Sequence, residues 1–279
     1  MRALLTVTQL TLHEAGRRRI LLAALICGVA FVGLFATGFH FIVLDMKKDA
    51  ARNTSLELRM MLTFFTLAGL YGANFLAVMT GILLPVDTLS GEISSGVLQT
   101  LASKPVRRSE ILLGKWLAFV TISILYLGLL VGGVLIAARI ESGSVPPNLI
   151  RALPLLALEI ALVVTLAIAG GTQLGTITNG VVVFGFYGLA FIGGWVERIG
   201  ALAANRAAER IGTLASLIMP TESLWGLASY HMQPAIMRDV MITPFTPASI
   251  PSPAMVAWAI GYLVVTLGLA ISWFRKRPL

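Results

Sequence analysis

Residues 86–115 form the stretch of this sequence whose residue types and spacing suit binding to another molecule. Four apolar residues recur there at every fourth position, which places them on one narrow stripe of a helix. Charged side chains in the same stretch could pair with charges on a partner protein or with anionic lipid headgroups. Gly91 and Gly96 have no side chain, so a partner's backbone could approach closely there. The stripe consists of Leu89, Ile93, Val97 and Leu101, and the charged residues are Glu92, Lys104, Arg107 and Arg108.

This stretch is expected to form a short helix and then a turn. Lys104 and Pro105 end the predicted helix, because proline disfavours helical geometry in the residue before it. Ser109 is expected to cap the following helix, and Glu110 places a negative charge in its first turn. A solvated connection with a cap at each end would explain the polar residues but not the apolar stripe. We therefore expect a helix along one membrane face that contacts a partner in the aqueous phase.

Glu159 is the one acidic residue well inside a predicted membrane span. A carboxylate within the hydrocarbon is costly, so such a residue is a candidate for a functional role. The alternative is that Glu159 faces a wet outer cavity or hydrogen-bonds a neighbouring helix. Glu197 and Arg198 follow Trp195 where another span should end, and they are expected to anchor that span at the interface.

No residue pattern typical of catalysis or metal binding is present in the sequence. The histidines are far apart without ligand spacing, and neither H-E-x-x-H nor G-x-S-x-G occurs. Cys27 is the single cysteine, which excludes an internal disulfide and a cysteine-based metal site. A phosphate-binding loop of the form G-x-x-x-x-G-K-S/T is also missing. We expect no catalytic, cofactor or metal site on this chain.

The composition indicates an integral membrane protein. Of the 279 residues, 57% are hydrophobic and 12% are charged, whereas soluble domains are about 25% charged. Mean hydropathy is +0.88, and the apolar residues are gathered into long runs. The formal charge of +8 could suggest nucleic acid, but no basic patch interleaved with exposed aromatic residues is present. Much of this charge flanks the apolar runs, where membrane proteins use it for orientation.

The predicted fold is an all-α membrane protein with six transmembrane helices in a single domain, residues 1–279. A helix in the interface plane is expected over residues 1–19, and short outer helices over 197–253. Thr176, Thr178 and Asn179 are expected to form a tight connection before a short fifth span. Gly128/Gly132 and Gly171/Gly175 have the spacing that lets helices pack closely. The predicted spans are residues 20–44, 60–84, 116–138, 152–174, 180–196 and 254–274.

Basic residues favour an orientation with both termini in the cytoplasm. Lys and Arg totals are nearly equal on the two sides of the predicted membrane. However, Arg17–Arg19 and Arg275–Arg277 directly adjoin the first and last spans, where positive charge counts most. An even number of spans keeps both basic triplets on one side.

Two runs resemble ABC-2 type transporter permeases. The first runs from Ser90 to Lys115 and resembles the loop between the second and third spans of that family. Its matching residues are Ser90-Gly-Glu-Ile, Gly96, Leu98, Leu101, Lys104-Pro105, Arg108, Glu110-Ile111 and Gly114-Lys115. The second comprises Thr178-Asn-Gly-Val-Val-Val-Phe184 and Ala190-Phe-Ile-Gly-Gly-Trp195.

The resemblance implies that the loop carries a coupling helix that docks into a cleft on a separate ATPase subunit. ATP and magnesium would bind that partner, which drives export. Two permease subunits, either two copies of this chain or this chain with a close relative, would form the substrate path in the plasma membrane of a prokaryote. The first, second and fifth spans are expected at the interface between the two permease subunits. The residues given the coupling role are Gly91, Glu92, Ile93, Gly96, Val97, Leu98, Leu101, Lys104, Pro105 and Arg108.

Other classes of membrane protein fit the sequence less well. Leu89-Ser-Gly-Glu resembles the start of the ABC ATPase signature LSGGQ, but the last two residues differ and no phosphate loop accompanies it. A secondary transporter or channel-like protein independent of ATP would need ion-coupling residues in both halves, and Glu159 stands alone. A membrane enzyme would need a catalytic constellation. The substrate is not specified, since relatives handle lipids, peptides, ions and drugs.

Overall fold

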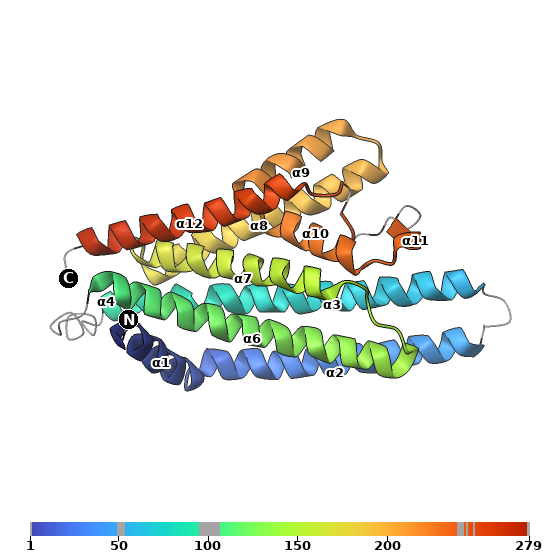
Figure 1. Ribbon diagram of the computed structural model, residues 1–279, viewed down its shortest axis with the longest axis horizontal. Helices are drawn as coiled ribbons and strands as arrows, with labels where there is room; N and C mark the ends of the chain where they lie inside the picture. Colours follow the sequence, from blue (N-terminus) through green and yellow to red (C-terminus); the bar gives the residue numbers. More distant parts are fainter. Residues whose placement is uncertain are drawn as a thin grey trace.

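The computed structural model of the chain describes residues 2–48, 54–94, 107–238, 243, 245–247 and 249–277. Within these residues the chain is helical and has no strand (Figure 1). Six helices have the length and apolar character needed to cross a membrane. The prediction of an all-α membrane protein is confirmed. The helices are α1 (Arg2–Gly16), α2 (Arg19–Lys48), α3 (Ser55–Val86), α4 (Thr88–Ser94), α6 (Arg108–Ser142), α7 (Leu149–Gly171), α8 (Thr176–Leu202), α9 (Arg206–Ile218), α10 (Thr221–Met232), α11 (Ala235–Arg238) and α12 (Pro253–Lys276).

The observed helix boundaries correct three predictions. α7 ends at Gly171, so the turn into α8 comes before Thr176, and both Thr178 and Asn179 lie inside α8. α8 continues to Leu202, so the fifth span is not short. α6 begins at Arg108, and Arg107 rather than Ser109 precedes its first turn. The reason is that Glu110 accepts a hydrogen bond from the Arg107 backbone N–H at 3.3 Å.

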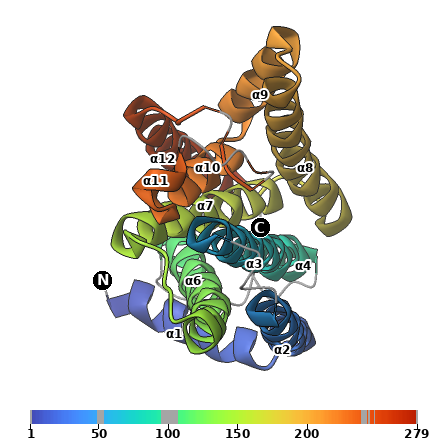
Figure 2. The same ribbon diagram turned by 90° about the vertical axis from the view of Figure 1, so that its right-hand side faces the viewer.

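The long helices run side by side, and α1 and α4 lie at one end together with both chain termini (Figure 1). We call this the α4 end. α7 occupies the centre, where it contacts α3, α6, α8, α10 and α12. α2 lies on the outside against α3 and α6, and α12 lies on the outside against α7 and α6. The end view in Figure 2 shows α3 between α2 on one side and α8 on the other.

Glycines bring neighbouring helices into close contact, at Gly171 as the sequence suggested and also at positions that it did not suggest. A Cβ atom at Gly114 of α6 would lie 2.8 Å from Val7 Cβ, so α1 packs directly on the backbone of α6. Gly128, Gly132 and Gly175 face open space within this chain. The predicted role of the Gly128/Gly132 pair in packing is therefore wrong within this chain, because both residues point away from the neighbouring helices. Gly171 packs against α4 and α8.

α9 folds back along α8 to form a helical hairpin, drawn at the top of Figure 1. Asn205 caps α9, because its side-chain oxygen accepts hydrogen bonds from the backbone N–H groups of Ala207 (3.0 Å) and Ala208 (3.3 Å). Gly193 of α8 packs against Ala215 of α9, with no room for a side chain. Short helices were expected in residues 197–253, and α9, α10 and α11 lie there.

Candidate functional site

The α4 end contains the described part of the predicted coupling loop. Leu89 is buried and packs over Gly171 at the end of α7. Ser90 Oγ lies 2.9 Å from Thr176 Oγ1, and Thr176 Oγ1 donates a hydrogen bond of 2.8 Å to Asp87 Oδ1. α4 is therefore fixed to the turn between α7 and α8. Leu89 belongs to the apolar core of the bundle, so the stripe does not present all its residues to a partner.

Asn179 joins three helices below this turn. Its side chain is buried, and Nδ2 donates hydrogen bonds to Val86 O at 3.1 Å and to Ala167 O at 2.8 Å. These carbonyls belong to α3 and α7, while Asn179 itself lies on α8. Gly170 makes room for the amide, because a Cβ atom there would overlap Asn179 Oδ1. The end of α3 is thereby held in register with both later spans.

Glu92 and Lys115 form an ion pair that links α4 to α6. The side chains are 12% and 4% exposed, so the pair is largely shielded from solvent. The sequence suggested a charge on a partner protein as the counter-charge of Glu92. In the structure the counter-charge is Lys115 of the same chain, about two turns into α6.

Basic residues near both termini also form hydrogen bonds at the α4 end. Arg18 Nη1 donates a hydrogen bond of 3.4 Å to Thr88 Oγ1 of α4. Arg108 Nη1 donates to the backbone oxygen of Arg277 at 2.6 Å, and the Arg277 side chain donates to Thr172 O. The two termini are therefore attached to the same end of the bundle as α4.

The structure locates only some of the residues to which the coupling role was assigned. Gly91 and Glu92 lie in the last part of α4, and Gly91 lies against the Asp87 carboxylate. Ile93 belongs to α4 as well, and Arg108 begins α6. The other assigned residues lie outside the described part of the chain: Gly96, Val97, Leu98, Leu101, Lys104 and Pro105. Their coupling role stays a prediction.

Glu159 lies at the centre of the bundle and is completely enclosed. Its Oε2 accepts a hydrogen bond of 3.0 Å from Asn74 Nδ2 of α3, and both side chains are buried. A hydrogen bond to a neighbouring helix was one of the arrangements that the sequence left open. A buried carboxylate bound by an amide joins α3 to α7 without an ion pair.

A second buried polar cluster connects α3, α8 and α10. Arg198 of α8 forms an ion pair with Glu222 of α10, and their side chains are 6% and 5% exposed. The Tyr71 hydroxyl donates to Glu222 Oε1 at 3.3 Å and accepts a hydrogen bond from Trp195 Nε1 at 3.2 Å. Burial raises the pKa of the Glu222 carboxyl, while the Arg198 guanidinium acts in the opposite direction. The prediction that Arg198 anchors the end of the span at the interface is wrong, because α10 folds back and supplies a buried partner.

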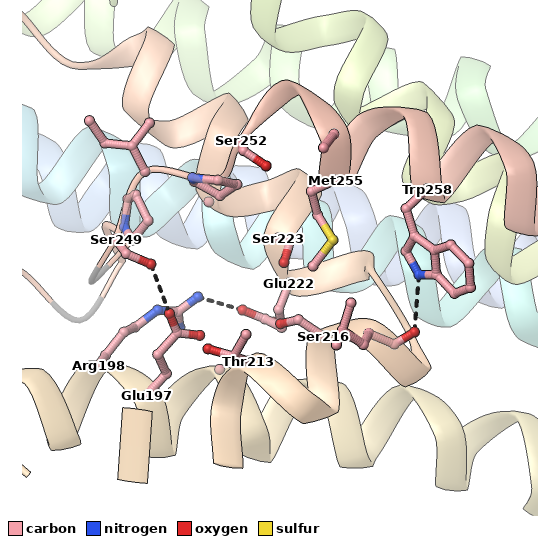
Figure 3. A pocket seen from close by; sticks show the side chains of 17 residues that line it. Glu197, Arg198, Thr213, Ser216, Glu222, Ser223, Ser249, Ser252, Met255 and Trp258 are labelled. Atoms are coloured by element: carbon pink, nitrogen blue, oxygen red, sulfur yellow. Dashed lines mark hydrogen bonds and ion pairs between the residues drawn. The ribbon is translucent and has the colours of Figure 1, made fainter. Parts of the chain in front are cut away.

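A pocket of about 500 Å³ adjoins this cluster. Figure 3 shows its lining, which comes from α8, α9, α10, residues 247 and 249–252, and the start of α12. Trp258 Nε1 donates to Leu217 O at 3.0 Å, and this bond holds α12 against α9. Ser249 Oγ donates to Glu197 Oε1 at 3.1 Å. The sequence offered one signal for this site, which was the charged pair Glu197 and Arg198 directly after Trp195.

A smaller, apolar pocket of about 270 Å³ lies between α2 and α3. Phenylalanine side chains dominate its lining, among them Phe31, Phe35, Phe39 and Phe65.

Among the described residues, no three His, Cys, Asp or Glu side chains gather as a metal site would require.

Comparison with known sequences bears on the whole bundle. The family model described as "ABC-2 family transporter protein" matches residues 9–279. A search of curated proteins finds no match to the chain. The family match extends from the middle of α1 to the end of the chain, so it includes both polar clusters and the α4 end.

Proposed function

Because the chain belongs to the ABC-2 family of transporter proteins, we propose that it is the permease of an exporter powered by a separate ATPase. A permease component of an ABC transporter spans the membrane and needs a source of energy. The sequence has no phosphate-binding loop, so ATP and magnesium would bind to the partner chain. The α4 end is the proposed place where that partner docks.

The observation that carries this proposal is the attachment of α4 to three spans. Glu92 pairs with Lys115 of α6, Leu89 packs on the end of α7, and Ser90 lies against Thr176 of α8. A displacement of α4 by a docked partner would therefore act on α6, α7 and α8 together. A loop connected only by its two ends would transmit much less of such a displacement.

The basic triplets support a cytoplasmic position for the α4 end. Arg17–Arg19 and Arg275–Arg277 adjoin α2 and α12, and the structure brings both to this end (Figure 1). Positive residues next to spans favour the cytoplasmic side. An ATPase in the cytoplasm could then reach residues 86–115. We therefore propose that the protein lies in the plasma membrane of a prokaryote with both termini inside.

The side formed by α2, α3 and α8 is the proposed interface with a second permease, either another copy or a close relative. α2 is almost uncovered within one chain, with large apolar residues such as Leu34 exposed. α3 lies between α2 and α8, so the first, second and fifth spans are neighbours (Figure 2). The phenylalanine-lined pocket between α2 and α3 would offer an exported molecule an apolar surface beside this interface.

Co-purification with the proposed ATPase partner tests the docking site. Leu98→Glu and Leu101→Glu should each abolish capture of the ATPase, because a charge would disrupt an apolar contact. Ile150→Glu is the matched control, since Ile150 is 87% exposed at the far end of the bundle. Retention of the ATPase by both loop variants would show that docking occurs elsewhere.

Labelling in intact cells tests the orientation. A cysteine placed in residues 86–115 should stay unlabelled by an impermeant maleimide until the cells are opened. A cysteine at Ile150 should react in intact cells. Labelling of the loop in intact cells would overturn both the orientation and the role of α4.

A further inference from the structure

The 500 Å³ pocket at the α8–α9 hairpin contains an excess of negative charge. Its charged lining residues are Glu197, Arg198 and Glu222. Arg198 and Glu222 neutralise each other as an ion pair, which leaves the Glu197 carboxylate. Arg198 acts electrostatically on Glu197 as the opposite charge, and Glu209 of α9 acts less strongly as a like charge. The pocket therefore favours a ligand with a positively charged group next to Glu197.

The guanidinium of Arg198 in the same pocket lies over the Tyr71 and Trp195 rings, and one of its donors has no hydrogen-bond partner among the described residues. Arg198 is 5% exposed, and its Nη2 pairs with Glu222. Nη1 is buried and has no hydrogen-bond partner among the described residues. An unused donor on a buried guanidinium is costly, and phosphate oxygens are well matched to it. In Figure 3 the guanidinium lies among the lining side chains, beside the Glu197 carboxylate.

Apolar side chains of α9 and α12 border the polar lining of the pocket. Thr213 and Ser216 of α9 face the pocket. The neighbouring face of α9 exposes Ile211, Leu214 and Ile218, which recur at helical spacing. Trp258 of α12 contributes to the lining and is 46% exposed. A polar pocket beside exposed aliphatic side chains suits an amphiphile whose acyl chains lie along the helices.

We propose that this pocket binds the headgroup of a zwitterionic phospholipid that carries a phosphate and a primary ammonium. The ammonium donates to the Glu197 carboxylate, and the phosphate accepts from the Arg198 guanidinium. A phosphatidylglycerol headgroup lacks the cation, and a choline headgroup has no N–H to donate. The site lies away from the α4 end, and α8 contributes both to it and to the proposed permease interface.

Binding of short-chain lipids to the purified full chain in detergent tests this assignment. The probes are dihexanoyl phosphatidylethanolamine, phosphatidylcholine and phosphatidylglycerol, with affinities measured by titration under native mass spectrometry. We expect the ethanolamine lipid to bind most tightly. Glu197→Gln should weaken it about ten-fold, the effect of losing one charge-assisted hydrogen bond, and leave phosphatidylglycerol unchanged or tighter. Equal affinities for the ethanolamine and glycerol lipids in the natural sequence would overturn the proposal.

Two control variants separate recognition from a change in folding. Asp45→Asn removes an acid with a 79% exposed side chain at the end of α2 and should leave all three affinities unchanged. Glu197→Lys should reverse the preference toward phosphatidylglycerol, a result that simple misfolding would not produce. An unchanged preference in both Glu197 variants would overturn the role of this carboxylate.

Free phosphoethanolamine distinguishes a lipid from a soluble ligand. Without acyl chains it should bind at least ten-fold more weakly than the dihexanoyl lipid, since the aliphatic face of α9 then contributes nothing. Equal binding of the free headgroup would overturn the assignment to a lipid. The measurement needs no ATPase, so its failure would leave the proposed docking site at α4 unaffected.

Discussion

Removing the positive charge of Lys115 should destabilise the permease, because it leaves Glu92 as a nearly buried carboxylate without its counter-charge. The two side chains are 4% and 12% exposed. Breaking a buried ion pair from one side costs about 3–5 kcal/mol. Glu92 retains some solvent contact and further interactions with its surroundings. We therefore expect Lys115→Met to lower the free energy of unfolding by about 3 kcal/mol, the low end of that range.

Unfolding of the purified chain in mixed micelles, followed by circular dichroism, measures this effect. The series consists of Lys115→Met, Glu92→Gln and the double variant. The double variant has no unpaired charge, so it should be more stable than Lys115→Met alone. Lys48→Met is the matched control, because Lys48 pairs with Asp45 at 3.8 Å on the surface and both side chains are more than 70% exposed. We expect no measurable change from it.

Strict additivity in this series would refute the reasoning. If the double variant loses the sum of the two single losses, the two residues do not act as a pair. An unfolding free energy of Lys115→Met equal to that of the natural sequence would show that the site is better solvated than the burial indicates.

The same variants also report on coupling. A double variant that folds and binds the ATPase but loses substrate-stimulated hydrolysis would show that this link between α4 and α6 transmits the motion.

Three further substitutions probe the contacts that hold the helices together, each read out as an unfolding free energy. Asn179→Leu removes two hydrogen bonds to backbone carbonyls and should cost about 1–2 kcal/mol, the range for such bonds between membrane helices; no loss would show that these bonds do not contribute. Gly193→Ala should cost about 1–3 kcal/mol by overpacking against α9, whereas Gly188→Ala, whose side chain would meet open space, should be neutral or slightly stabilising. Equal effects of the two alanines would contradict the glycine contact. Arg198→Gln leaves the buried Glu222 unpaired and should cost about 3–5 kcal/mol, and an effect as small as that of a surface substitution would mean that water reaches the pair.

The six spans could be predicted from the sequence because long apolar runs have one inexpensive arrangement in a bilayer. A helix satisfies its own backbone in hydrocarbon, so length and hydropathy are sufficient to locate it. The ends of the helices were harder to predict from the sequence. Thr178 and Asn179 look like turn residues, yet both lie within α8, where Asn179 finds carbonyls of α3 and α7. The bond to the α3 carbonyl depends on the packing of segments more than 90 residues apart.

The candidate sites show the same contrast between features that are local in the sequence and features that depend on packing. The family resemblance located the loop of residues 86–115, because motif residues are read directly from the sequence. It did not reveal that Glu92 pairs with Lys115, since nothing in the spacing shows how α4 folds against α6. The pocket beside Arg198 was missed because its lining comes from four helices and residues 247 and 249–252. A sequence alone does not show whether a charged residue is exposed or buried. The position of α10, which supplies the partner of Arg198, decides this here.

α7 explains why so few polar residues are enough to organise this bundle. Lipid chains are as apolar as leucine, so hydrophobic burial alone cannot select one helix neighbour over another in a membrane. α7 receives one side-chain hydrogen bond from each of four different segments. Asn74 of α3 binds Glu159, Trp116 of α6 binds Thr165 at 2.8 Å, Asn179 of α8 binds Ala167 O, and Arg277 after α12 binds Thr172 O. These bonds are spread along α7 from its middle to its end at α4, so each fixes the axial position of one neighbour. The positions of α3, α6, α8 and α12 are thereby fixed relative to α7. α2 makes no such bond to α7 in the described residues; it is held by the Tyr126 hydroxyl of α6, which donates to Ala24 O at 2.7 Å, and by close packing on α3 and α6.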